Sequence, residues 1–180
     1  MLQNITVVGC GTIGSNLCIE LAKNKIKYLK IYDSDLISFE VNDCFIPFIK
    51  QQSKLYKIDV VKFLVKLNSN NFTNVSVFNK NINESLNDES FIIDCRDRKE
   101  TYINPDLEIS LDGSILHLNS VSRFGKKIER SSLYVFEKCE YYLVKSLKII
   151  INYLKNKEYE FKEFRDYDLT KDGIFHIIQV

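Results

Sequence analysis

The sequence lacks three features, each of which would have pointed to a particular class of protein. Its five cysteines stand singly, so it offers no C-x-x-C pair for a zinc site. It has no apolar leader and no long apolar run free of charge, which predicts a cytoplasmic chain without membrane contact. Its 25 basic and 24 acidic residues nearly cancel, so no global field favours a nucleic-acid partner.

The sequence also lacks internal repeats and low-complexity linkers, and its length suits a single domain spanning residues 1–180. Short β-branched runs alternate with segments of helical periodicity, which is typical of an α/β fold. Strand patterns fall at 5–8, 29–32, 75–78, 91–94, 107–111, 115–118, 132–136 and 174–178, and helical patterns at 14–23, 53–67 and 140–155. We predict a Rossmann-like doubly wound sheet, mostly parallel, with antiparallel strands toward the C-terminal end.

Three segments in this assignment have a particular character. The helical pattern at 53–67 carries a broad apolar stripe that includes Phe63 and Leu67, and we expect this stripe to face the core. The run at 158–168 mixes charged and aromatic residues and is assigned to no element. The run at 174–178 is a candidate for a final edge strand.

The functional prediction begins in the first 35 residues. A buried strand at 5–8 stops at Gly9, which lets the backbone turn sharply, and Gly11 lets a phosphate approach the main chain. Gly14 lets the next helix pack close to the strand, so the phosphate would meet free N–H groups at a helix N-terminus. The second strand ends at Asp33, where such units place a carboxylate on the ribose hydroxyls. The pattern predicts a nucleotide site; the alternative is a tight turn that binds nothing.

The other reactive side chains are predicted to be structural. Cys10 lies inside the glycine turn and Cys95 inside a strand, so both are expected in the core or the turn. Cys139 stands between two glutamates in sequence, which would raise rather than lower a thiol pKa. His117 and His176 have no partner at metal-ligand spacing, which favours structural histidines.

Four motifs appear in an order that resembles the ThiF/MoeB/HesA family and the adenylation domains of ubiquitin-activating enzymes. The glycine turn is followed by a strand ending in a D-x-D motif, Asp33-Ser34-Asp35. Lys57 stands where the family has a lysine at the start of the next helix, with Lys54 as the rival position. A later strand ends in D-x-x-D at residues 94–97, and residues 112–115 resemble the glycine-containing turn before the family's long strands. The resemblance covers roughly the first two thirds of the chain.

The resemblance implies an adenylyltransferase, a nucleotidyltransferase that uses ATP with Mg²⁺. Such an enzyme attaches AMP to the C-terminal carboxylate of a ubiquitin-like or sulfur-carrier protein, or to a small carboxylic acid, and releases pyrophosphate. By the same resemblance, Asp33 would hold the ribose, Lys57 would neutralise the transferring phosphates and Asp97 would hold the metal. The implied nucleotide site comprises Gly9, Gly11, Thr12, Ile13, Gly14, Asp33, Asp35, Asn42, Lys57 and Arg98, with Lys57 and Asp97 catalytic. A homodimer, or a heterodimer with a relative, is also implied.

The chain departs from the family pattern at several positions. Thr12 replaces the third glycine of the turn, and the crossover loop offers Asn42 and Asp43 but no arginine. Losing such an arginine removes a bidentate clamp on developing charge. Arg98 stands where the family has Asn, and the N-terminal helical arm and paired zinc cysteines are missing. Arg96 and Arg98 either supply the lost positive charge or are a pair of surface arginines.

Three functions therefore remain open. The first is an active adenylyltransferase that acts on a carboxylate. The second is a catalytically degenerate nucleotide-binding scaffold that pairs with an active relative, which the lost arginines favour. The third is an NAD-dependent oxidoreductase domain, which rests on the glycine turn and Asp33 alone and leaves the matches at Lys57 and Asp97 unexplained.

Overall fold

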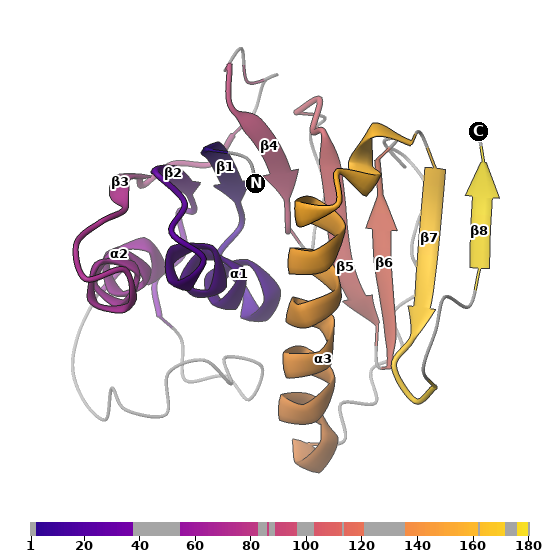
Figure 1. Cartoon of the computed structure of the whole chain (residues 1–180). Helices are drawn as coiled ribbons and strands as arrows, with labels where there is room; N and C mark the ends of the chain where they lie inside the picture. The colour runs from indigo at the N-terminus through magenta and orange to yellow at the C-terminus, as the bar shows by residue number, and fades with distance from the viewer. Residues whose placement is uncertain are drawn as a thin grey trace.

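The computed structural model describes residues 3–37, 55–82, 86, 89–96, 103–112, 114–120, 136–161, 163–171 and 176–179. These residues form one eight-stranded sheet with three α-helices and a short 3-10 helix (Figure 1). The elements follow in the order β1 (Asn4–Val8), α1 (Thr12–Lys23), β2 (Tyr28–Tyr32), α2 (Lys57–Asn68), β3 (Asn74–Phe78), β4 (Phe91–Asp94), β5 (Leu107–Asp112), β6 (Ile115–Asn119), α3 (Phe136–Lys155), η1 (Glu158–Glu160), β7 (Glu163–Asp168) and β8 (His176–Gln179).

The strand order in the sheet is β3-β2-β1-β4-β5-β6-β7-β8. The pairs from β3 to β5 are parallel, and the pairs β5–β6, β6–β7 and β7–β8 are antiparallel. The predicted Rossmann-like α/β sheet, mostly parallel with antiparallel strands toward the C-terminal end, is confirmed. The strand expected at 174–178 is β8, and it forms one edge of the sheet.

The sheet reverses its direction of growth at β1. The chain moves outward from β1 to β2 and β3, and then returns to place β4 on the other side of β1. In register, Val8 at the end of β1 lies beside Tyr32 of β2 and Asp94 of β4. The carboxyl ends of these three strands therefore meet at one level, and a sheet of this kind binds ligands at such a reversal.

Two apolar clusters lie on opposite faces of the sheet. The larger cluster joins all three α-helices to one face, and Val7 and Ile31 belong to it; Figure 1 shows the helices side by side over this face. The smaller cluster joins Val8 and Ile92, which alternate with the first set, to Ile82 of the β3–β4 connection. Crossover connections between parallel strands are right-handed, so their direction along the sheet decides which face they cover. The chain moves one way from β1 to β2 and β3 and the opposite way from β3 to β4 and β5, so the later connections cover the other face. Among the described residues, the second face is covered by connections rather than helices.

Three sequence-based assignments need correction. Phe136, predicted as the end of a strand at 132–136, is the first residue of α3, and the rest of that segment lies outside the described residues. The second helix begins at Lys57 rather than at 53, because Tyr56 instead pairs with Leu36 in an antiparallel bridge. Phe63 and Leu67 were expected in the core, but they are 64% and 61% exposed. Ile58, Val61 and Val65 alone fill the buried side of this helix.

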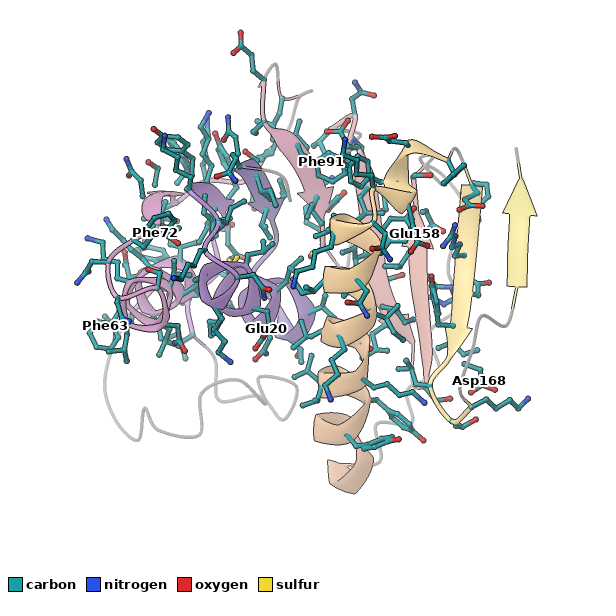
Figure 2. All side chains as sticks on the ribbon, viewed as in Figure 1. Glu20, Phe63, Phe72, Phe91, Glu158 and Asp168 are labelled. Atoms are coloured by element: carbon teal, nitrogen blue, oxygen red, sulfur yellow. The ribbon has the colours of Figure 1, made fainter. Side chains whose placement is uncertain are left out.

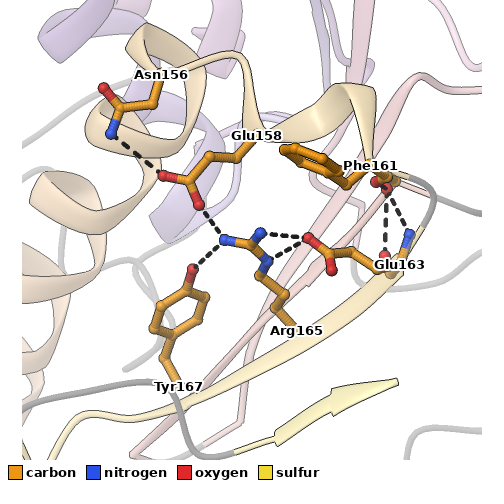
Figure 3. A network of polar contacts seen from close by, with 7 residues as sticks. Asn156, Glu158, Phe161, Glu163, Arg165 and Tyr167 are labelled. Carbon is orange, nitrogen blue, oxygen red and sulfur yellow. Dashed lines mark hydrogen bonds and ion pairs between the residues drawn. The ribbon is translucent and has the colours of Figure 1, made fainter. Parts of the chain in front are cut away.

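A fourth correction concerns the run at 158–168, which contains a strand, β7, that the sequence did not suggest. Its inward positions are Glu163, Arg165 and Tyr167, so the alternation places charged groups on the buried side. Arg165 binds the carboxylates of Glu163 and Glu158 (Figure 3). Its guanidinium also lies 5.3 Å from the ring centre of Tyr153 of α3. A charge-paired network therefore replaces apolar contacts beneath the end of α3.

Candidate functional site

The turn between β1 and α1 has the form that its three glycines predict. Gly9 has φ +91°, and a Cβ there would lie 3.0 Å from the backbone nitrogen of Arg96. A Cβ at Gly14 would lie 1.9 Å from the carbonyl oxygen of Gly9, so only glycine allows the helix to approach the turn. At Gly11, by contrast, no atom of the described residues lies within 4 Å of the corresponding position. Gly11 is the N-cap of α1, and no side chain caps this helix start.

Asp33 links the end of β2 to the glycine turn. One oxygen of its carboxylate accepts a 2.6 Å hydrogen bond from the backbone N–H of Cys10, and the other accepts a 2.7 Å bond from the N–H of Asp35. Burial raises the pKa of Asp33 above the ordinary carboxyl value, although these two N–H groups act in the opposite direction. The carboxylate is therefore fixed in orientation beside the turn, and it keeps lone pairs that can accept ribose hydroxyls.

Lys57 is held beside the same site by a short antiparallel contact. The N–H of Ile37 donates to the carbonyl of Leu55, and the N–H of Lys57 donates to the carbonyl of Asp35. The Lys57 ammonium lies 3.3 Å from the Asp35 carboxylate, and its side chain is only 14% exposed. These contacts bring together the two ends of the segment 38–54, which lies outside the described residues, and they place a cation at the first residue of α2.

A second cation lies on the opposite side of the glycine turn, at the end of β4. Arg96 donates from Nε and Nη2 to the two carboxylate oxygens of Asp94, each at 3.0 Å. The backbone N–H of Arg96 adds a third 3.0 Å bond to the same carboxylate. Asp94 is buried, whereas the Arg96 side chain keeps 17% of its surface exposed. The bidentate geometry fixes the guanidinium next to Gly9.

The site combines features that suit a phosphorylated nucleotide. Open space at Gly11 faces a helix start, where backbone N–H groups and the helix dipole favour anions. The Asp33 carboxylate at the end of β2 can accept hydroxyl groups, and Lys57 at the start of α2 and Arg96 after β4 carry positive charge on either side of the turn. Each of these two cations is paired with a carboxylate. Among the described residues, no group of three or more metal-ligating side chains comes together.

Most of the predicted site residues converge at this crevice. The structure brings together Gly9, Gly11, Thr12, Ile13, Gly14, Asp33, Asp35 and Lys57 around the ends of β1 and β2. Asn42, Asp97 and Arg98 lie outside the described residues. The sequence indicated Arg96 only as one of two arginines after β4. The sequence does contain a local indication of its ion pair with Asp94. An acid two residues before an arginine at the end of a strand can pair with that arginine when the chain turns.

The other reactive residues lie apart from this crevice or are inert. Cys10, Cys18 and Cys95 are buried and form no disulfide, and burial was predicted for Cys10 and Cys95. Burial raises the pKa of the Cys10 thiol, so this group stays protonated at neutral pH. His117 Nδ1 lies 2.6 Å from Asp166 Oδ1 across the β6–β7 pair, which fits a structural role. No helix in the described part of the chain is long and apolar enough to cross a bilayer.

The fold and the glycine turn place the chain in the Rossmann-like α/β class. Solved structures with the same fold support this assignment. No family model and no curated protein sequence matches the chain. E. coli MccB has the same fold at 14% identity and a TM-score of 0.67, with 98% of this chain and 62% of MccB covered. PaaA is also similar, at 14% identity and a TM-score of 0.64, with 99% and 64% covered.

Other structures of E. coli MccB that match this chain contain ATP, or AMPCPP with MccA. MccB is also described as a microcin C7 biosynthetic enzyme in a complex with N-formylated MccA. The chain spans slightly less than two thirds of the length of these proteins. At such low identity, the similarity establishes the fold.

Proposed function

We propose that this chain is an ATP-dependent adenylyltransferase that activates a carboxylate as an acyl-adenylate. The observation that carries the proposal is that Gly11, a buried carboxylate and a lysine lie together around one glycine turn. Gly11 faces open space, Asp33 is anchored to the glycine turn, and Lys57 begins the next helix. The occurrence of ATP in MccB, which has the same fold, supports ATP as the nucleotide.

The proposed reaction is a displacement at the α-phosphorus of ATP. A carboxylate oxygen of the substrate forms a bond to this phosphorus, and the bond to the bridging oxygen of pyrophosphate breaks. Pyrophosphate leaves with the electron pair, so charge accumulates on the phosphate oxygens in the transition state. The backbone N–H groups at the start of α1 and the Lys57 ammonium offset this charge. Asp33 positions the ribose and with it the α-phosphate.

The proposal assigns the remaining site residues to the phosphates and the metal. Thr12, Ile13 and Gly14 supply N–H groups, while Asp35 holds Lys57 in place. Mg²⁺ would accompany ATP, because it prefers phosphate oxygens, water and one or two carboxylates. Asp97 is the proposed carboxylate, and Asn42 and Arg98 are proposed phosphate contacts. Arg96 is already held beside Gly9, so it is a second source of positive charge for this chain.

The proposed substrate is the terminal carboxylate of a peptide or small protein. The MccA peptide in structures of MccB supports a peptide, and the resemblance found in the sequence adds ubiquitin-like and sulfur-carrier proteins or a small carboxylic acid. In each case the attacking group is a carboxylate, so a single assay covers all of them. The chain is proposed to work as a homodimer or as a heterodimer with a relative.

Exchange of labelled pyrophosphate into ATP tests the proposal. With Mg²⁺ and a panel of carboxylate acceptors, we expect acceptor-dependent exchange by the unaltered chain. Lys57→Ala should lower the exchange rate by about 10²- to 10³-fold, because a charge beside the transferring phosphates is lost. Lys62→Ala, which removes a lysine from the same helix, should change it by less than about twofold. Equal rates in Lys57→Ala and in the unaltered chain would contradict the role of Lys57.

A second function is favoured by one observation. Both described cations of the crevice are already paired with carboxylates, which reduces the positive charge available to a transition state. A scaffold that binds ATP without turning it over, and that pairs with an active relative, would tolerate this arrangement. ATP binding without exchange for any acceptor, together with exchange when a relative is added, would favour the scaffold. Binding of NAD in preference to ATP would favour an oxidoreductase domain.

A further inference from the structure

The two turns at the amino ends of β2 and β3 form one surface, at the end of these strands opposite the glycine turn. Tyr28, the first residue of β2, lies beside Asn74, the first residue of β3. The hydroxyl of Thr73 donates a 2.8 Å hydrogen bond to the carbonyl of Ile26, and the N–H of Asn74 donates a 2.9 Å bond to the carbonyl of Lys27. The turn from α1 to β2 and the turn from α2 to β3 are therefore held side by side.

Lysine is the only charged residue type in the two chain segments that build this surface. Residues 21–32 contain four lysines and residues 60–83 contain three, and neither segment contains aspartate, glutamate or arginine. Lys25, Lys27 and Lys66 are exposed, and in the described part of the chain none of the three forms an ion pair. Positive charge in the last turn of a helix stabilises the helix, which accounts for Lys66 in α2. This effect does not account for Lys27, which lies four residues beyond the end of α1.

Large apolar side chains protrude beside these lysines. Phe63 and Leu67 are 64% and 61% exposed, and they lie one turn apart on the outer side of α2. Phe72, in the turn after α2, is 55% exposed, and Figure 2 shows Phe63 and Phe72 at the end of the molecule formed by α2 and β3. Tyr28 is 43% exposed, and the ammonium of Lys27 lies 5.1 Å from its ring centre. Large apolar side chains grouped on a surface mark an interaction site more often than chance exposure does.

We propose that this surface binds the anionic headgroups of a lipid bilayer. It is called the Lys–Phe surface below, and its members are Lys25, Lys27, Phe63, Lys66, Leu67 and Phe72. Each lysine near a negatively charged bilayer strengthens binding by about fivefold, and apolar side chains that enter the boundary between headgroups and acyl chains strengthen it further. Stable attachment needs two such signals, and the surface has both. The sequence-based expectation of no membrane contact rested on the lack of a membrane span, and a contact of this kind requires none.

The residue types favour a bilayer over a nucleic acid as the anionic partner. Leu67 has no ring on which a base could stack, although aromatic stacking is what single-stranded nucleic acids require. The cations are lysines, which act as point charges and suit a diffuse layer of headgroups, whereas arginine is the residue that pairs bidentately with individual phosphates. The glycine turn lies at the other end of the strands, so the bound chain would keep its nucleotide crevice turned away from the bilayer.

Co-sedimentation with lipid vesicles, in the absence of ATP, tests the proposal. We expect the unaltered chain to bind phosphatidylcholine vesicles that contain about 30% phosphatidylserine, and to bind pure phosphatidylcholine at least about tenfold more weakly. Raising the salt to about 0.5 M should remove most of the binding, because salt screens the lysines from the headgroups. Lys25→Ala with Lys27→Ala should weaken binding to the anionic vesicles by about 30-fold. Phe63→Ser with Phe72→Ser should weaken it by about tenfold or more, because two apolar side chains no longer enter the bilayer.

Two matched controls remove the same kinds of side chain outside the Lys–Phe surface. Lys148→Ala with Lys155→Ala removes two exposed lysines of α3. Tyr141→Ser with Phe161→Ser removes two aromatic side chains that are 61% and 59% exposed. Both controls should bind anionic vesicles like the unaltered chain, and circular dichroism establishes that every variant is folded.

The proposal is overturned by a lack of binding to anionic vesicles, by equal binding to neutral vesicles, or by unchanged binding in either variant of the Lys–Phe surface. Equal losses in the controls would overturn it too, because the effect would not belong to this surface. Fluorescence anisotropy with a single-stranded RNA of about 20 nucleotides is the parallel measurement. RNA binding that the surface variants abolish, without vesicle binding, would assign the surface to a nucleic acid instead. These measurements need neither ATP nor an acceptor, so their result is independent of the proposed reaction.

Discussion

The residues around the glycine turn fall into two groups: some are required by the packing of the fold, and others are proposed to contact a ligand. Gly9 and Gly14 are required by packing, because a side chain at either would meet atoms of the turn or of the strand beside it. Gly11 is not required by packing among the described residues, since none of their atoms lies within 4 Å of its Cβ position. Asp33 belongs to both groups: it fixes the turn through the Cys10 N–H, and it faces the position expected for a ribose.

The state of Asp33 predicts a pH dependence of nucleotide recognition. Burial raises its pKa, so in the folded chain this carboxyl takes up a proton at a higher pH than an ordinary carboxyl does. The ionised form accepts the ribose hydroxyls, and a hydrogen bond to a charged group contributes about 1.5–3 kcal/mol. We therefore expect ATP to bind about tenfold or more tightly than 2′,3′-dideoxy-ATP above the folded pKa, and this preference to disappear as the pH falls through it.

Isothermal titration calorimetry with both nucleotides measures the ratio of their dissociation constants. The phosphates of the two nucleotides titrate alike, so the ratio isolates the ribose contact. In Asp33→Asn the ratio should be small and independent of pH. A ratio for the unaltered chain that is flat over the acidic range would show that the ribose does not meet Asp33.

At the scale of elements, the sequence predicted the helices and strands whose buried side chains are the apolar residues of a regular hydrophobic pattern. β1 and β4 are runs buried on both faces, β2 buries Leu29 and Ile31, and α1 keeps Leu17, Cys18 and Leu21 on one side. β7 could not be found in this way, because its inward side carries Glu163 and Arg165. The two pair with each other, and Arg165 also contacts Glu158 of η1 and Tyr153 of α3, contacts that no hydrophobic pattern in the sequence reports. α2 shows the opposite case, since Phe63 continues an apolar stripe in sequence but faces solvent.

Removing the cation of the β7 network should strongly destabilise the fold. The Glu163 side chain is only 4% exposed, and Arg165 is its ion-pair partner. Arg165→Leu leaves a buried carboxylate without compensation, so the free energy of unfolding should fall by about 3–5 kcal/mol. Urea unfolding followed by circular dichroism measures this change.

Two further variants test whether the loss comes from the uncompensated charge. Arg165→Leu combined with Glu163→Leu should recover part of the stability, because the buried carboxylate is also removed. Lys171→Leu, at a side chain that is 69% exposed, should change the free energy of unfolding by less than about 1 kcal/mol. A loss of less than about 1 kcal/mol in Arg165→Leu would mean that the network contributes little.

At the scale of the whole molecule, the order of the strands assembles the site. The reversal at β1 brings the ends of β1, β2 and β4 together, although Asp33 and Arg96 are far apart in sequence. The glycine pattern and Asp33 were readable from the sequence because they depend on local backbone geometry. The pairing of Lys57 with Asp35 depends on how the end of β2 meets the start of α2 and required the three-dimensional structure, whereas Arg96 pairs with Asp94 only two residues away. Asn42, Asp97 and Arg98 stay predictions.

The most direct test of a nucleotide site at the glycine turn is calorimetric titration of ATP into the unaltered chain and into Gly11→Leu. The backbone of Gly11 is extended, with φ −69°, and no described residue lies within 4 Å of its Cβ position, so leucine should cost less than about 1 kcal/mol of stability. The account predicts that the unaltered chain and Lys23→Leu, altered at the other end of α1, bind ATP alike. Gly11→Leu should keep its melting temperature and lose ATP binding. Undiminished binding of ATP by a folded Gly11→Leu variant would contradict a nucleotide site at this turn.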